Sequence, residues 1–414
     1  MSTSAPLLED ATADFRAPPL SCGPVRRIRD DAEALAVAET IGVKLAEGAA
    51  ERDHERILPF EEIDQLSQSG LLAITVPRQF GGAEVQPYTV ARIVATLSAA
   101  DGSIGQIPQN HFLMLEALRL QGTAEQKRFF YERVLAGERI GNALAETGTK
   151  TAYDHGTRLK RDGPVYRLNG RKFYSTGVLF AHWVAIVSND DVSRSMLAFV
   201  PRGAQGITVL DDWTGFGQRT TGSGTTLLDN VEVHPFSVLS FQALFDRPTA
   251  FGPFAQILHA AIDHGIAEGA FTDTVRFVHK ARPWKFSGVD RASDDPYIIA
   301  AVGELKLRVD TSAALLRRAG SFVHRAMDYP SDETVAEASI AVSEAKIAST
   351  EAALHVTSKL IELGGSSATL AKHNLDRHWR NARTHTVHDP IRWKYHAVGN
   401  YWLNGVKPLR HGAI

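Results

Sequence analysis

Helical patterning occupies both ends of this chain and gives way to strand patterning in the middle. From Arg27 to about Ile140 the sequence is rich in Ala and Glu, with Pro59, Pro77 and residues 81–82 (Gly-Gly) at the breaks between helices. After Phe251, apolar residues recur every seven positions, at Ile340, Ile347, Leu354 and Ile361. This α–β–α order excludes a doubly wound nucleotide-binding fold, in which strands and helices alternate throughout.

Between residues 141 and 250 the sequence turns to short runs of β-branched and aromatic residues. Such runs predict strands at residues 183–187, 196–200 and 225–233. The Asn169-Gly170 dipeptide predicts a tight hairpin turn between residues 165–168 and 171–174, because both residue types tolerate positive φ angles.

These patterns divide the 414 residues into four segments. We expect a mobile arm at residues 1–25, a helical domain at 26–140, a β domain at 141–250 and a helix bundle at 251–414. The first residues lack a basic start followed by a long apolar run, so no signal peptide is expected.

Composition narrows the partners and the compartment. The 45 Lys and Arg residues nearly balance the 47 Asp and Glu residues and are interspersed with them, which argues against nucleic acid binding. A single cysteine, Cys22, fits a reducing, cytoplasmic environment. No run approaches the roughly 18 apolar residues of a membrane span.

A glycine-containing segment at residues 215–220 comes closest to a dinucleotide fingerprint. It lacks the last glycine and has no helix after it, so we interpret it as a turn. The chain is therefore expected to lack a nicotinamide site of its own.

Candidate chemistry is densest near the C-terminus, where six of the 16 histidines fall within the last 42 positions. Asp389 and Pro390 predict the end of a helix, so that His385 and His388, three residues apart, project from one face into a cavity. Imidazoles change charge near neutrality and suit proton management. The plain alternative is that they cap helix-end carbonyls.

A metal site is a further interpretation of the same histidines. His385 and His388 could supply two zinc ligands, but no cysteine accompanies them and no carboxylate is obviously placed as a third ligand. We therefore predict no metal.

Two more segments carry candidate binding residues. Ser175 or Thr176, at the end of a strand, could donate a hydrogen bond to the N5 or O4 edge of a flavin, or merely cap the strand. Arg282 could bind a phosphate and Trp284 could stack on a ring, although an exposed Arg beside a proline explains the same pattern. Trp213 is either a ring wall or β-domain core.

Together these segments resemble a known family. The domain order and residues 211–213, 281–284, 295–297, 379–385 and 388–390 resemble the dibenzothiophene monooxygenases and their relatives in sulfur acquisition, within the acyl-CoA dehydrogenase superfamily. The resemblance covers nearly the whole chain from about residue 30. It implies the acyl-CoA dehydrogenase fold, with an N-terminal helical domain, a middle β-barrel domain and a C-terminal four-helix bundle.

The resemblance also implies a function and a homotetramer. A separate reductase would supply reduced FMN, and molecular oxygen would add at flavin C4a to give a hydroperoxide that oxygenates a small organosulfur compound. The residues carried over are Asn142 and Ser175 at the flavin ring, Trp213 beside the ring, Arg282 at the phosphate, His385 and His388 in the oxygen cavity, and His111 as a further candidate.

Departures from the dehydrogenase branch favour this interpretation. The glutamate that removes a substrate α-proton in many dehydrogenases is absent after residues 380–383, and Asp389, which lies near that place, has a shorter reach. The glycine-rich segment that grips the adenosine half of FAD remains only as residues 362–367, which favours FMN over FAD.

Three alternatives stay open. The chain could be an FAD-dependent acyl-CoA dehydrogenase, or a flavin monooxygenase that hydroxylates nitrogen or an aromatic ring. From another class, it could be a helical oligomer that has lost catalysis and only binds flavin or a partner. The polar cluster around His385 and His388 argues against that last alternative.

Overall fold

The computed structural model describes residues 25–151 and 154–413. Cys22 and all but the last residue of the arm predicted at residues 1–25 lie outside the described residues. The described residues form two compact units. The first comprises residues 117–213 and 222–244, and the second comprises residues 25–116, 214–221 and 245–413.

An eight-stranded sheet forms the first unit. Its order is β6-β7-β3-β2-β4-β5-β8, and β1 pairs in parallel with β4. The strands are β1 (Ile140–Ala143), β2 (Arg158–Asp162), β3 (Val165–Lys172), β4 (Trp183–Asn189), β5 (Ser195–Pro201), β6 (Ile207–Val209), β7 (Thr226–Val233) and β8 (Val238–Ser240). The three predicted strands are confirmed as β4, β5 and β7. β4 is buried along nearly its whole length, which explains its continuous apolar run.

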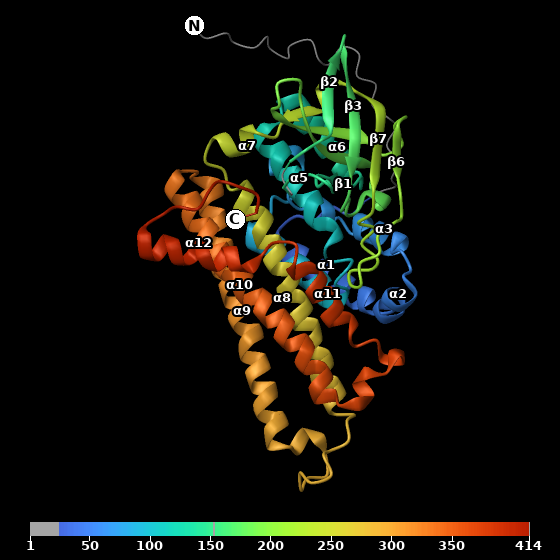
Figure 1. Cartoon of the computed structure of the whole chain (residues 1–414), viewed down its shortest axis with the longest axis vertical. Coiled ribbons are helices and arrows are strands. Elements are labelled where there is room, and N and C mark those ends of the chain that lie inside the picture. Colours follow the sequence, from blue (N-terminus) through green and yellow to red (C-terminus); the bar gives the residue numbers. More distant parts are fainter. Residues whose placement is uncertain (1–24, 152–153, 414) are drawn as a thin grey trace. The chain divides into compact units, whose positions relative to one another are not determined.

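The hairpin predicted at Asn169-Gly170 is wrong. β3 runs through both residues and pairs antiparallel with β2, and the chain turns instead at residues 163–164. Figure 1 shows β2 and β3 as the paired arrows of this hairpin.

Residues Asn169 and Gly170 form part of a β-bulge instead of a turn. The register between β3 and β7 shifts between Leu168 and Gly170, and the Asn169 side chain accepts a hydrogen bond from the backbone N–H of Asn230 at 2.8 Å. A Cβ on Gly170 would lie 2.3 Å from Thr157 Oγ1, so only glycine fits there. A bulge and a close approach select the same residue types as a tight turn.

Helices fill the first third of the chain after residue 25, as predicted. Pro59 caps the start of one helix and Pro77 precedes a 3₁₀ turn, so the predicted breaks at these prolines are confirmed. The elements are α1 (Asp31–Ala46), α2 (Ala49–Glu55), α3 (Phe60–Gln68), η1 (Leu71–Ala73), η2 (Arg78–Phe80), α4 (Pro87–Ala100), α5 (Ile107–Gln121) and α6 (Ala124–Leu135).

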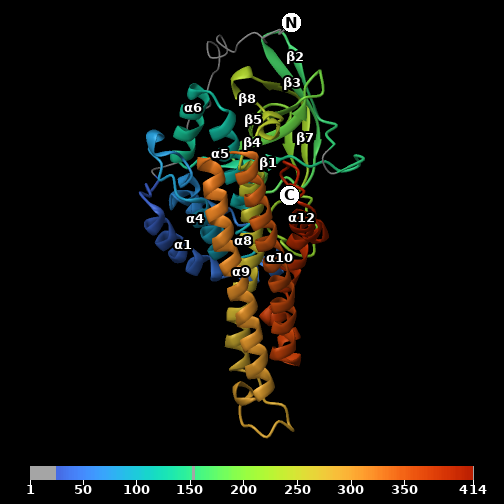
Figure 2. The same cartoon turned by 90° about the vertical axis from the view of Figure 1, so that its left-hand side faces the viewer.

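Long helices return after residue 250. They are α8 (Phe251–Val278), α9 (Pro296–Asp328) and α10 (Asp332–Gly364), with the shorter α7 (Ala243–Asp246), α11 (Arg377–Thr386) and α12 (Ile391–Asn404). Figure 2 shows α8, α9 and α10 running side by side. Asp295 caps α9 by accepting from the Tyr297 N–H, and Ser331 and Thr334 form a capping box at the start of α10.

Glycines let α8 approach α4 closely. A Cβ on Gly265 would lie 2.2 Å from the Ala95 carbonyl oxygen, and one on Gly269 would lie 2.3 Å from that of Ala99. These two glycines, one turn apart, therefore allow α8 to pack closely against the backbone of α4.

The predicted helical, β and helical order is confirmed by these elements. None of the described helices combines the length and apolar character that crossing a bilayer requires.

Candidate functional site

Asn142 and Ser175, predicted to contact a flavin, meet in the first unit. Asn142 lies on β1, and its backbone N–H donates to the carbonyl of Thr176, next to Ser175, at 3.3 Å. Asn142 and Ser175 are 7% and 1% exposed, and among the described residues neither Asn142 Oδ1 nor Ser175 Oγ has a hydrogen-bond partner. An unpaired buried polar atom costs about 1–3 kcal/mol. These atoms therefore mark a place where a ligand or water completes the hydrogen bonding.

The neighbouring hydroxyl is already engaged. Thr176 Oγ1 lies 2.7 Å from Ser223 Oγ, within hydrogen-bond distance. Of the two candidate hydroxyls, those of Ser175 and Thr176, the Ser175 hydroxyl is the one without a partner and can bind a ligand.

Trp213 lies beside this segment. Its ring is 6.0 Å from the ring of Tyr174, the residue before Ser175. Tyr174 has a φ of 55°, an uncommon conformation for a bulky residue. The chain therefore turns sharply where β3 leads into Ser175, and such backbone outliers gather at functional sites.

A buried ion pair fixes the strands that carry these residues. Lys172, at the end of β3, donates to Glu146 Oε1 at 2.6 Å and to the Leu144 carbonyl at 3.0 Å. Burial would raise the pKa of Glu146, but the hydrogen bond and charge of Lys172 outweigh burial and hold it at about 2. The end of β3 is thereby tied to the segment that follows β1.

The second unit contains a cluster of three imidazoles, His259, His385 and His388, called here the histidine cluster. His259 comes from α8, His385 from α11, and His388 follows α11. His259 Nδ1 lies 3.0 Å from His385 Nε2. The His259 and His388 rings stack with centroids 4.2 Å apart, whereas those of His385 and His388 are 6.4 Å apart. His259 therefore lies between the two histidines that the sequence singled out.

The predicted helix end at Asp389 and Pro390 is wrong, because α11 already ends at Thr386. The His388 N–H donates to the His385 carbonyl at 3.0 Å, beyond the end of the helix. The His385 side chain is fully buried, while that of His388 is 49% exposed. One imidazole is sealed inside the unit and the other remains accessible.

Asp263 on α8 anchors the sealed imidazole. Its carboxylate accepts from His385 Nδ1 at 2.5 Å, from Lys346 Nζ at 2.6 Å and from Thr350 Oγ1 at 2.7 Å. Burial would raise the pKa of Asp263, but the charge of Lys346 and the hydrogen bonds from His385 and Lys346 hold it at about 2. Asp263 is thus a buried, ionised carboxylate whose charge Lys346 balances.

These bonds fix the tautomers of two rings. An ionised carboxylate only accepts, so His385 Nδ1 carries a proton and His385 Nε2 is an acceptor. His259 Nδ1 must then donate to His385 Nε2, which leaves His259 Nε2 without a proton. Burial lowers the pKa of His385 and lowers that of His259 well below its usual value, so both rings are neutral near pH 7.

The predicted histidine pair is not the set closest to a metal geometry. One potential ligand atom from each of His259, His388 and Asp389 lies within 4.8 Å of the others. Asp389 is the carboxylate third ligand that the sequence did not reveal, and its Oδ2 accepts from Gln256 Nε2 at 2.9 Å. Both ring nitrogens of His385 are occupied. That the chain uses no metal stays a prediction.

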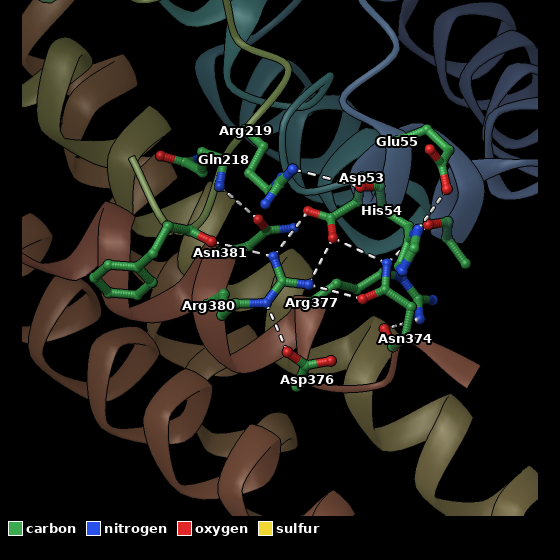
Figure 3. Close-up of polar contacts among 12 residues, drawn as sticks. Asp53, His54, Glu55, Gln218, Arg219, Asn374, Asp376, Arg377, Arg380 and Asn381 are labelled. Atoms are coloured by element: carbon green, nitrogen blue, oxygen red, sulfur yellow. Dashed lines mark hydrogen bonds and ion pairs between the residues drawn. The ribbon is translucent and has the colours of Figure 1, made fainter. Parts of the chain in front are cut away.

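Polar contacts hold α11, and with it His385, in place (Figure 3). Arg380 binds the buried Asp53 of α2 through two bonds, of 2.6 and 3.2 Å, and donates to Asp376 at 2.7 Å. Planar guanidinium–carboxylate pairs of this kind are geometrically specific. The segment at residues 379–381 thus positions the helix that carries His385.

The same helix holds the loop at residues 214–221. Asn381 Oδ1 accepts from the Gln218 N–H at 2.6 Å, and Figure 3 shows the two residues facing each other. The predicted turn at residues 215–220 is confirmed as part of this loop.

His111 lies on α5 and is 2% exposed. Its Nε2 lies 2.8 Å from the carbonyl oxygen of Leu72 in η1, which fixes the ring there.

Arg282 and Trp284 lie in an exposed segment beyond the far end of α8, and Trp284 is 69% exposed. Since α8 continues from His259 to Val278, a rise of 1.5 Å per residue places Arg282 roughly 30 Å along the chain from the histidine cluster.

The sequence analysis missed His259, Asp263 and Lys346. A signal was present, because Gln256, His259 and Asp263 interrupt an apolar run of α8 at intervals of three and four residues. Such spacing places polar side chains on one face of a helix. A buried polar face needs partners on other helices, and here α10 and α11 supply them.

Comparisons with known proteins fit these observations. The families described as acyl-CoA dehydrogenase, N-terminal domain, and acyl-CoA dehydrogenase, C-terminal domain, match residues 28–138 and 257–393. The dibenzothiophene monooxygenase of Rhodococcus qingshengii is 32% identical over 396 residues, which cover 92% of this chain and 95% of that protein. The predicted acyl-CoA dehydrogenase fold is confirmed.

Two further proteins are similar over nearly their whole length. SfnC of Pseudomonas putida, named a probable FMNH2-dependent monooxygenase, is 31% identical, with 91% of this chain and 96% of SfnC covered. The crystal structure of FMN-bound TdsC from Paenibacillus sp. A11-2 superposes with a TM-score of 0.88 at 28% identity, covering 92% of this chain and 100% of TdsC.

Proposed function

Because this chain belongs to the flavin-dependent monooxygenases of the acyl-CoA dehydrogenase family, we propose that it oxygenates a small organosulfur compound with FMN that a separate reductase supplies in reduced form. A similar protein acts on dibenzothiophene, a second is named FMNH2-dependent, and a third binds FMN. We therefore propose that the sulfur atom of the substrate is the atom that receives oxygen.

The observation that carries the proposal is the unpaired Asn142 Oδ1 and Ser175 Oγ. An amide oxygen and a hydroxyl, buried and without partners, fit the polar edge of an isoalloxazine ring, which presents both donors and acceptors. We assign Asn142 and Ser175 to that edge, with Thr176 shaping the strand end and Trp213 flanking the ring.

When bound, reduced FMN would react with oxygen at C4a to form the hydroperoxide that delivers one oxygen atom to sulfur. The protein's part is to bind, orient and manage protons. His388 is the accessible imidazole of the histidine cluster, and we propose that it donates the proton that the departing oxygen requires.

We assign Arg282 of one copy of the chain to the phosphate of the FMN that lies at the histidine cluster of another copy. Roughly 30 Å of helix separates Arg282 from the histidine cluster, more than the length of FMN, so one chain cannot bring both to one flavin. A symmetric oligomer can, and we propose that it is the homotetramer that the family resemblance implies. Exposed Trp393, Trp402 and Leu403 on α12 are consistent with a subunit interface. Trp284, beside Arg282, would contact the same ligand.

The structure weakens the dehydrogenase alternative. Asp389 occupies the place nearest to the missing glutamate, and burial would raise its pKa, but the charge and hydrogen bond of His388 drive it well below the usual range. A carboxylate held ionised in this way is a poor base for a carbon-bound proton.

The test is to identify the flavin and the reaction together. Heat-released FMN, and oxygen uptake with reduced FMN that depends on an alkanesulfinate, a sulfone or dibenzothiophene, are expected. Ser175→Ala should weaken FMN binding, whereas Ser240→Ala, on an exposed strand end of the same sheet, should not. Release of FAD, together with bleaching by an acyl-CoA, would overturn the proposal.

A further inference from the structure

His259 is the residue of the histidine cluster that the proposed function leaves unexplained. It is 5% exposed, yet its ring stacks on His388 and hydrogen-bonds to His385. His259 therefore lies between the accessible and the sealed imidazole and contacts both.

We propose that His259 links His388 to His385 as a proton relay, in which His385, beside the buried Asp263–Lys346 pair, takes up a proton from His388 and returns it. The relay deepens the proposed function and rests on it for its use in oxygen chemistry. Its existence does not depend on the flavin.

The hydrogen bonds dictate how a proton would travel. A proton arriving at His259 Nε2 forms an N–H bond there, the His259 Nδ1–H bond breaks, and a new N–H bond forms at His385 Nε2. His385 is then a cation in contact with the Asp263 carboxylate. The reverse sequence returns the proton to His388, so no atom or electron is gained or lost.

The outer step spans a short gap. No more than 4.8 Å separates one ring nitrogen of His259 from one of His388, and the proposed outer step passes through a single water molecule between them. The half-exposed His388 side chain connects the relay to solvent.

Charges around the relay keep its resting state neutral. Lys346 from α10 and Asp389 after α11 face His259, and Lys394 from α12 and His411 in turn face Asp389. The charge of Lys346 disfavours a second cation beside Asp263. A proton taken up by His385 is therefore bound weakly and can leave again.

A matched pair of variants tests the relay. In His259→Asn the amide nitrogen replaces Nδ1 and still donates to His385, but it cannot pass a proton onward. His264→Asn is the control, because His264 is a buried histidine of the same helix whose Nδ1 lies 2.7 Å from Ser312 Oγ.

The first measurement uses the protein without flavin. Nitrogen-15 NMR of histidine side chains should place the proton on Nδ1 of both His259 and His385. Solvent exchange of the His259 Nδ1–H, the proton that the relay moves, should slow at least about tenfold in His388→Ala and remain unchanged in His264→Asn. Equal exchange rates in His388→Ala and the unaltered protein, or a proton on Nε2 of either ring, would overturn the relay.

The second measurement uses reduced FMN, oxygen and substrate. His259→Asn should bind FMN as before but form several-fold less product per oxygen consumed, while His264→Asn should match the unaltered protein. An unchanged yield of product per oxygen in an active His259→Asn enzyme would show that the reaction does not use the relay. If the unaltered protein never consumes oxygen, the proposed function fails while the exchange measurement still decides the relay.

Discussion

His385 Nδ1 donates to Asp263 Oδ1 with both side chains fully buried, and this bond determines which protons the neighbouring imidazoles carry. Because His259 occupies the other nitrogen of His385, the accessible His388 is left as the group that meets solvent and ligand. The division between a sealed and an accessible histidine leads to the following predictions.

Replacing His388 with alanine should uncouple the reaction. Without the accessible imidazole, proton delivery fails and consumed oxygen leaves as hydrogen peroxide, so peroxide per oxygen should rise several-fold while folding stays intact. His396→Ala, on α12 and outside the histidine cluster, is the control. An unchanged yield of product per oxygen would remove His388 from proton delivery.

Replacing Arg282 with alanine should weaken FMN binding by about 1.5–3 kcal/mol, the size of a hydrogen bond to a charged group. Lys285→Ala, in the same exposed segment, should have a much smaller effect. A flavin titration measures both, and equal affinities for Arg282→Ala and the unaltered protein would contradict the assignment.

Mixed oligomers test whether Arg282 serves another copy. Co-expressed Arg282→Ala and His388→Ala chains should regain roughly a quarter of the unaltered activity, because a mixed pair contains one complete site. Arg282 acting within its own chain would give no complementation.

Replacing Lys346 with methionine should destabilise the protein by about 3–5 kcal/mol, because Asp263 would keep its buried charge without a cation. Asp263→Asn combined with Lys346→Met should recover part of that loss. Urea unfolding at fixed protein concentration measures both variants. A Lys346→Met protein as stable as the unaltered one would show that the ion pair does not matter for folding.

Stability should fall as the pH drops below 6.5. Burial lowers the pKa of His259, His385 and His378, the last to about 4, so below 6.5 the unfolded chain binds protons that the folded chain excludes. Each group contributes about 1.4 kcal/mol per pH unit between its folded pKa and 6.5. The His378→Gln protein should lose stability less steeply, and a protein that gains stability between pH 7 and 5 would contradict this account.

The sequence predicted the element types well because periodicity and caps are local. It failed at Asn169-Gly170, where the same residue types fit a bulge opposite Asn230 that only sheet pairing reveals. It also placed the end of α11 too late, since Thr386 and Val387 carry no strong stop signal.

Only part of the histidine cluster could be predicted from the sequence. His385 and His388 stood out by their spacing, whereas His259 and Asp263 were hidden in an apolar stripe whose partners lie over 80 positions away. Long-range pairing of this kind depends on how helices pack, which spacing within one helix does not specify.

The most direct test of the central claim is the origin of the oxygen in the product. With reduced FMN, an organosulfur substrate and oxygen-18 gas, mass spectrometry should find one heavy oxygen atom bound to sulfur in each product molecule. Product that carries oxygen only from water, or oxidation of an acyl-CoA in place of the sulfur compound, would contradict a monooxygenase.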